Sequence, residues 1–145
     1  MPRTSARRPD IDDRLLVLDL QRATHAVGIR LESQLSGIGV TQGEAHVLAL
    51  LADAAPHTVG DLQRGLNHRP STLSGILDRL EGRGLVTRTL NETDRRSLLV
   101  ALTRPGRDAA RAVVDALREV EAHAADSVAP RDLAGFRAVV DALGD

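Results

Sequence analysis

Four charged side chains lie within the seven-residue segment NETDRRS at residues 91–97. Asp94 precedes two consecutive cations, Arg95 and Arg96, and short apolar runs lie on both sides of the segment. A guanidinium group donates paired hydrogen bonds to phosphate or to guanine, and a neighbouring carboxylate can fix its orientation. These residue types therefore indicate recognition of phosphates or bases.

A second group of polar side chains precedes this segment. Pro70 suits the first position of a helix that extends to about Arg83. At 100° per residue, one face of that helix is aliphatic and the outer side carries small or polar residues. The aliphatic residues are Leu73, Ile76, Leu77 and Leu80, and the outer ones include Ser71, Thr72, Ser74, Gly75 and Arg79. Small side chains can approach base edges in a major groove about 12 Å wide. Arg69 and Arg79 are placed to hold phosphates, and we expect His68 to touch DNA or solvent.

The surrounding pattern predicts a mainly α-helical domain with a small β-hairpin. Helices are expected from Ile11 to about Leu35, behind Thr41-Gln-Gly-Glu44, behind Thr58-Val-Gly-Asp61, from Pro70, behind Thr103 and from Pro130. The runs LVTRTL and SLLVAL flank NETDRR and predict a two-stranded antiparallel hairpin. A short helix, a turn, a second helix and a hairpin in this order predict a winged helix-turn-helix.

Composition excludes several classes of chemistry. The 145 residues include no Cys, Trp or Tyr, so thiol catalysis, disulfides and zinc–thiolate sites are excluded. No motif supplies a convergent nucleophile and base, so we expect no enzyme activity and no cofactor. No apolar run is long enough for a membrane span, and the cytoplasm is the expected compartment.

Charge is unevenly distributed although the formal net charge is only −1. Residues 61–104 carry eight Arg against five acidic residues, whereas residues 10–60 and 105–145 are acidic overall. The excess of cations thus coincides with the predicted winged unit.

These patterns divide the chain into four segments of one integrated domain. We expect a flexible basic arm over residues 1–9, a helix over 10–36, the winged helix-turn-helix over 37–102 and C-terminal helices over 103–145. The first and last helical segments have wide apolar surfaces.

The segment at residues 77–107 resembles the multiple-antibiotic-resistance regulator (MarR) family of bacterial transcription factors. The matching pattern is Asp78-Arg79-Leu80-Glu81, Gly84-Leu85-Val86, Arg88, Asp94-Arg95-Arg96, Leu102-Thr103 and Gly106. The resemblance implies a six-helix dimer fold, in which residues 10–36 form a dimerisation helix and residues 103–145 the C-terminal dimerisation helices. It also implies a homodimer on double-stranded DNA with a pseudo-palindromic operator. It also implies a ligand-responsive repressor, whose small-molecule effector enters between the dimer helices and the winged unit. By this resemblance Arg96 enters the minor groove, Asp94 orients it and Arg95 holds a phosphate.

Several alternatives stay open. Asp94 could start an Asx turn, Gly75 could accommodate packing, and Arg79 could form a structural ion pair near Glu81 or Asp78. The five His residues raise a metal-responsive regulator as an alternative, although no close ligand spacing occurs among them and no metal site is expected. A winged helix that binds proteins instead of DNA is a further alternative, and the N-terminal arm could track a groove or be an undirected tail.

Overall fold

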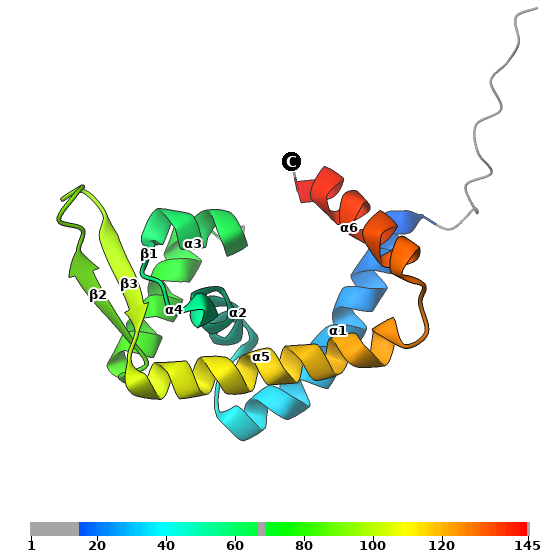
Figure 1. Ribbon diagram of the computed structural model, residues 1–145, viewed down its shortest axis with the longest axis horizontal. Coiled ribbons are helices and arrows are strands. Elements are labelled where there is room, and N and C mark those ends of the chain that lie inside the picture. Colours follow the sequence, from blue (N-terminus) through cyan, green and yellow to red (C-terminus); the bar gives the residue numbers. More distant parts are fainter. Residues whose placement is uncertain (1–14, 67–68, 145) are drawn as a thin grey trace, which may run out of the picture.

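The computed structural model describes residues 15–66 and 69–144, which follow the expected order of four helices, a hairpin and two helices (Figure 1). The helices are α1 (Leu16–Ile38), α2 (Gln42–Leu50), α3 (Val59–Leu66), α4 (Pro70–Gly82), α5 (Arg104–Ala125) and α6 (Pro130–Gly144), with a short 3-10 helix η1 (Leu51–Asp53) after α2. The strands are β1 (His57–Thr58), β2 (Val86–Leu90) and β3 (Leu98–Leu102). The predicted fold class is confirmed. The predicted basic arm at residues 1–9 and the expected start of the first helix at 10–14 lie outside the described residues.

Threonine caps start three of the helices, as their spacing predicts. Thr41 Oγ1 accepts from the Glu44 amide at 3.3 Å, and the Glu44 carboxylate accepts from the Thr41 amide at 3.1 Å. Thr58 and Asp61 form the same reciprocal pair, and Thr103 Oγ1 accepts from the Gly106 amide at 3.0 Å. These contacts pair amides that a helix start would otherwise leave without partners.

The end of α1 differs from the prediction. The sequence predicts a break at SGIGV, but the helix continues through Ser36 and Gly37 to Ile38. It ends where Gly39 adopts a left-handed conformation with φ of 79°, so that its amide can donate to the carbonyls of Leu35 and Ser36. The second glycine therefore ends the helix, because only there does the backbone leave the helical region.

The sheet has three strands, not the two that the sequence predicts. Strand β3 pairs antiparallel with β2 over its full length, with Val86 opposite Leu102 and Leu90 opposite Leu98. On its other side β3 pairs with β1, where His57 lies opposite Val100. Strand β1 escapes prediction because two residues directly before a helix cap are too short to show alternation.

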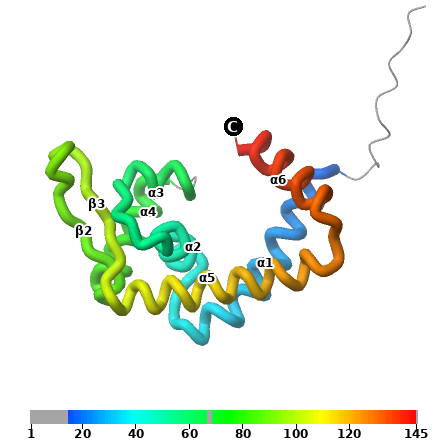
Figure 2. The backbone as a smooth tube through the Cα atoms, in the orientation of Figure 1, coloured from blue at the N-terminus to red at the C-terminus, as the bar shows by residue number. Residues whose placement is uncertain are grey.

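The core is aliphatic and lies between α2, α4, α5 and the sheet. The predicted inner face of α4 is buried, as are residues from α2, β3 and α5. These residues include Leu73, Ile76, Leu77 and Leu80 of α4, Val47 and Leu48 of α2, Val100 of β3 and Ala110 and Val113 of α5. The tube in Figure 2 shows α5 running along the base of the molecule, from the hairpin at one end to α1 and α6 at the other.

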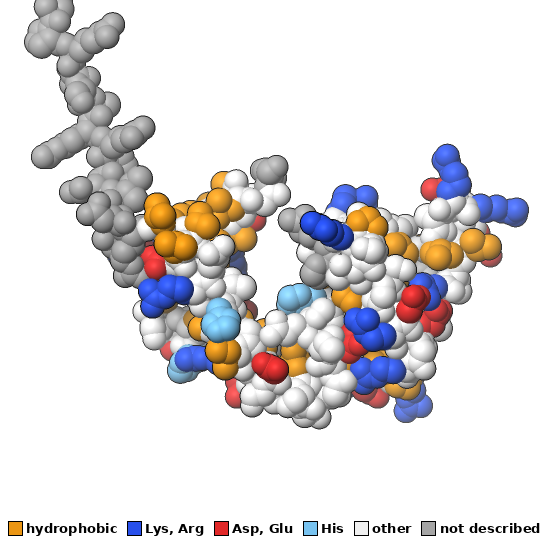
Figure 3. Space-filling model, turned by 180° about the vertical axis from the view of Figure 1, so that it is seen from behind, with side chains coloured by type: hydrophobic (Ala, Val, Ile, Leu, Met, Phe, Trp, Pro, Cys, Tyr) orange, Lys and Arg blue, Asp and Glu red, His pale blue; other side chains and the backbone are white. Residues whose placement is uncertain are grey.

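Helices α1 and α6 leave large apolar side chains exposed. Helix α6 buries none of its residues, and Phe136 is 55% exposed. The exposed apolar residues here are Leu15, Leu16, Val17, Leu18, Val27 and Ile29 at α1, and Phe136, Val140 and Leu143 on α6. Figure 3 shows hydrophobic side chains gathered on this end of the molecule, away from the hairpin. Contiguous apolar surface of this kind is typical of a binding interface.

Within the described part of the chain, no helix combines the length and the apolar character that a membrane crossing requires.

The start of α5 lies against the turn that follows α4. Thr103 donates from its amide to the Leu85 carbonyl at 3.0 Å and from Oγ1 to the Gly84 carbonyl at 2.6 Å. A Cβ atom at Gly106 would lie 1.8 Å from the Leu85 oxygen, which is backbone and cannot rotate away. Glycine at this position therefore lets α5 approach the backbone of the turn between α4 and β2.

We expect Gly106→Ala to lower the free energy of unfolding by about 1 to 3 kcal/mol, the usual cost of overpacking. Chemical denaturation monitored by circular dichroism measures it. Gly82→Ala is the matched control, because a Cβ there meets no atom within 4 Å. Equal stability of the two variants would contradict the close approach.

Candidate nucleic-acid interface

The outer face of α4 carries the predicted small polar side chains. Arg69 occupies the N-cap position with extended backbone, and Pro70 follows at the first helical position. Ser71, Thr72 and Ser74 are exposed, as is Arg69. The structure thus brings these four predicted residues together at the start of one helix, with their side chains accessible.

Helix α3 and its cap precede α4 in the helix-turn-helix. The Thr58–Asp61 pair starts α3, and Arg64 contacts the Asp61 carboxylate one turn later. The hydrogen bond from Thr58 lowers the pKa of Asp61 below its usual range. His68, in the turn between the helices, lies outside the described residues.

The loop between β2 and β3, residues 91–97, is the wing tip, and hydrogen bonds close it. The Asn91 amide donates to the Ser97 carbonyl at 3.1 Å, and the side chain of Asn91 donates to Ser97 Oγ at 3.1 Å. Ser97 in turn donates from its amide and its hydroxyl to the Asp94 carbonyl. The wing tip therefore has a defined conformation although residues 92–96 are exposed.

Asp94 holds the backbone and the side chain of Arg96. Its Oδ1 accepts from the Arg96 amide at 3.1 Å, which is an Asx turn, and lies 3.5 Å from Arg96 Nε. The same carboxylate oxygen of Asp94 thus forms the turn and lies next to the Arg96 side chain, so the two roles considered for Asp94 are compatible. Arg96 is 95% exposed and Arg95 is also exposed, so both guanidinium groups face solvent. Figure 3 shows cationic side chains at this end of the hairpin.

Arg79 forms an ion pair that the sequence does not reveal. Its Nε donates to Glu44 Oε1 at 3.1 Å, whereas Glu81 and Asp78, the partners considered from the sequence, bind Arg88. Arg83 donates to the other oxygen of Glu44 at 3.1 Å. Arg79 keeps 55% of its side chain exposed, so ion pairing and phosphate contact are both open to it.

Arg88 connects the start of the hairpin to α4. It donates from Nε to Glu81 at 2.9 Å and from Nη2 to Asp78 at 2.7 Å. The hydrogen bond from Arg88 lowers the pKa of Glu81, and the same contact raises the pKa of Arg88. The sequence signal for this link is the acid pair Asp78 and Glu81 on α4 with an Arg in the following strand, but spacing alone does not identify the partners.

Gly75 has no tight neighbour. A Cβ atom there would lie 3.6 Å from Arg79 Nη1, an ordinary contact with the end of a flexible side chain. Close packing therefore does not account for this glycine, which costs roughly 1 kcal/mol relative to alanine within a helix.

No group of three or more His, Asp or Glu side chains that could hold a metal ion occurs in residues 15–66 and 69–144. His57 instead binds Asp53, with 3.0 Å between Nε2 and each carboxylate oxygen. This hydrogen bond lowers the pKa of Asp53.

The winged unit matches a known family in sequence. Residues 40–98 match the model of the MarR family. The HTH-type transcriptional repressor YetL of Bacillus subtilis (strain 168) is 32% identical over 79 residues, which cover 53% of this chain and 47% of that protein. The chain spans about half the length of the curated relatives it matches.

Similarity in structure extends over most of the chain. S. aureus MepR in its DNA-binding conformation has a TM-score of 0.82 at 19% identity, covering 90% of this chain and 96% of that chain. The transcriptional repressor CouR, solved bound to a 23-mer DNA duplex, has a TM-score of 0.77 at 26% identity, covering 90% of this chain and 93% of that chain. The shared fold therefore extends beyond the winged unit to the flanking helices.

We expect Arg88→Met to raise the pKa of Glu81 toward the usual glutamate range, because the first cause of its lowered value is lost. A carboxylate with a lowered pKa stabilises the fold above its unfolded pKa, and this contribution disappears as pH falls through the folded pKa. The stability difference between wild type and variant should therefore shrink in acid. Titration of the carboxylates by NMR measures the shift, with Asp53, which is paired with His57, as an internal control. An unchanged Glu81 titration would refute the link.

Proposed function

Because residues 40–98 match the MarR family model, we propose that this chain is a transcriptional repressor of that family, which binds a pseudo-palindromic DNA operator as a homodimer in the cytoplasm. One observation carries the proposal: the polar outer face of α4 and the arginines of the wing tip are both exposed, on consecutive elements of one winged unit. A helix and a hairpin in this arrangement fit a major groove and the adjoining minor groove.

In this proposal the exposed residues of α4 divide into two roles. Ser71, Thr72 and Ser74 read base edges, and Gly75 allows the backbone to approach the DNA. Arg69 and Arg79 hold phosphates and thereby fix the register of the helix on the duplex. His68 is a further proposed contact with the DNA.

The wing tip supplies a separate contact. Arg96 enters the minor groove, where the negative potential attracts a guanidinium group, and Arg95 holds a neighbouring phosphate. Asp94 orients Arg96 through the contacts described above. The tip thus positions its two arginines for different sites on the duplex.

The exposed apolar faces of α1 and α6 support the proposed homodimer. Helix α6 buries none of its residues within the chain, and a second copy would cover its Phe136 and Val140. Two winged units would then present their α4 helices about 34 Å apart, one turn of the duplex. Residues 10–36 and 103–145 act as dimerisation segments in this arrangement, and 37–102 as the DNA-binding unit.

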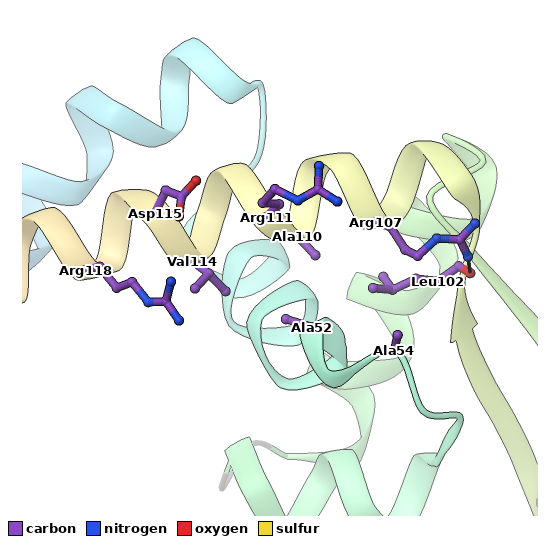
Figure 4. Close-up of a pocket in the computed structure, with 9 residues that line it drawn as sticks. All are labelled: Ala52, Ala54, Leu102, Arg107, Ala110, Arg111, Val114, Asp115 and Arg118. Carbon is purple, nitrogen blue, oxygen red and sulfur yellow. Dashed lines mark hydrogen bonds between the residues drawn. The ribbon is translucent and has the colours of Figure 1, made fainter.

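A cavity of about 350 Å³ between α5 and the winged unit is the proposed effector site (Figure 4). Its apolar wall consists of Ala52, Ala54, Leu102, Ala110 and Val114. Three arginines line it, Arg107, Arg111 and Arg118, and Asp115 is the acidic residue among the lining. The excess of cations favours a small anion with an apolar body. Such a ligand would weaken DNA binding by linkage if it favours a different spacing of the two α4 helices.

Selection from a randomised duplex library tests the function, followed by affinity measurements over a range of salt concentrations. A DNA-binding protein should yield an enriched two-fold symmetric sequence. The logarithm of its affinity should fall, for each tenfold rise in salt concentration, by about 0.9 per neutralised phosphate. No enrichment and no salt dependence would instead favour a protein-binding winged helix.

We expect Arg96→Ala to weaken binding to the selected duplex by roughly 1 to 3 kcal/mol while the dimer stays intact. Fluorescence anisotropy with labelled duplex measures the affinity, and sedimentation measures the dimer. Thr93→Ala, at an exposed position of the same loop that has no proposed contact, is the control and should bind normally. Normal binding by Arg96→Ala would remove the wing tip from the interface.

The effector proposal predicts that aromatic carboxylates release the DNA. The probe is 4-hydroxyphenylacetate, which NadR, a protein of the same fold, binds in a solved complex. It should raise the Tm of this chain and lower its affinity for the duplex, whereas the neutral amide should do neither. Arg111→Ala should abolish both effects, and equal responses to carboxylate and amide would contradict an anion site.

A further inference from the structure

Glu44 is the one buried charged side chain in the described part of the chain, with 3% of its surface exposed. It belongs to the capping box of α2, for which a carboxylate at the surface would suffice. Burial of a carboxylate is costly unless charged partners and hydrogen bonds satisfy it. The hydrogen-bond partners of the Glu44 carboxylate therefore indicate the structural role of this buried charge.

Both carboxylate oxygens of Glu44 bind α4 or its C-cap. Oε1 accepts from Arg79 Nε and Oε2 from Arg83 Nη1, each at 3.1 Å, and Oε2 also accepts from the Thr41 amide. The two arginines lie 35 and 39 residues away in sequence. One carboxylate thus joins the start of α2 to the last turn of α4.

The first turn of α2 also binds α1. Gln42 Nε2 donates to the Gly28 carbonyl at 3.1 Å. Arg83 lies near the end of the same helix, since a Cβ at Gly39, the C-cap of α1, would lie 3.7 Å from Arg83 Nη2. Helix α1 packs on α2, and α2 packs on α4. Glu44 therefore lies where the described contacts connect α1 to α4.

We propose that Glu44 is a positioning residue: its carboxylate, through Arg79 and Arg83, fixes the direction of α4 relative to α1. Charge-assisted hydrogen bonds are directional, so this contact restricts rotation of α4 more than apolar packing alone would. The consequence for DNA rests on the proposed function, in which α1 forms the dimer and α4 enters the groove. The angle between α1 and α4, which Glu44 helps to fix, then contributes to the spacing of the two α4 helices in the dimer.

The absence of cysteine makes a direct measurement possible. Ser33→Cys on α1 and Ser74→Cys on α4 are exposed sites for a pair of spin labels within one chain. Diluting the doubly labelled chain into a large excess of unlabelled chain isolates the distance within one molecule. Double electron–electron resonance spectroscopy then gives the distribution of distances between the two spin labels, on α1 and α4, without any DNA.

Glu44→Gln is the test variant, because glutamine retains the capping box while it loses the charge and one of the two acceptor oxygens. Asp61→Asn is the matched control, since Asp61 is the acidic residue of the second capping box and its partner Arg64 belongs to its own helix. Arg83→Met is a second test variant that leaves the carboxylate and the cap in place.

We expect Glu44→Gln and Arg83→Met to broaden or shift the distance distribution, and Asp61→Asn to leave it unchanged. Distributions that superpose on the wild type for both test variants would overturn the proposal, and so would an equal change in the control. If Glu44→Gln does not fold, the distance distribution of Arg83→Met alone tests the proposal.

Affinity for the selected duplex, measured on unlabelled chains, is the second readout. It should fall about two- to thirtyfold in both test variants, the range by which substitutions within a network of packed and ion-paired residues change the coupling between two sites. A wild-type chain that binds no DNA would refute the proposed function, while the distance measurement would still decide the role of Glu44.

Discussion

The fold depends on one backbone contact, where the start of α5 meets the carbonyl of Leu85. The amide of Thr103 donates to this oxygen, its hydroxyl donates to the neighbouring Gly84 carbonyl, and Gly106 leaves room for the Leu85 oxygen. Because Leu85 directly precedes β2, the contact joins α4, the hairpin and the long helix α5 in one place. The position of the winged unit relative to α5 is therefore fixed through backbone atoms as well as through side-chain packing.

Two ion-pair groups complete this framework on opposite sides of α4. Arg88 connects the strand to Asp78 and Glu81, while Glu44 holds Arg79 and Arg83. The first group is partly exposed and screened by solvent, so its contribution to stability is modest. The second contains a buried carboxylate and acts mainly on orientation. The outer face of α4 stays clear of both groups at its first turns, where the exposed serines and Thr72 lie.

Most of the fold was predictable because its signals are local. Capping boxes at Thr41 and Thr58, Pro70 and the aliphatic face of α4 each depend on residues within a few positions of one another. What the sequence did not reveal is nonlocal or short: the partner of Arg79 lies 35 residues away, and β1 has two residues. The position of a residue in the sequence pattern indicates which side of a helix it occupies. Which of several acidic residues pairs with a given arginine depends on tertiary packing. The proposed DNA-contacting residues were predicted from the α4 face and the wing tip, whereas the contacts of Glu44, Arg83 and Arg88 became visible only in the structure.

The hydrogen bonds that close the wing tip have a consequence for the energetics of association. Asn91, Asp94 and Ser97 hold the loop by polar contacts within residues 91–97, so its shape does not depend on a bound partner. Conformational entropy of the loop is then lost during folding and not when a complex forms. A preorganised tip of this kind favours slow dissociation, since release regains little backbone freedom, and only the long arginine side chains have to be ordered at the moment of contact.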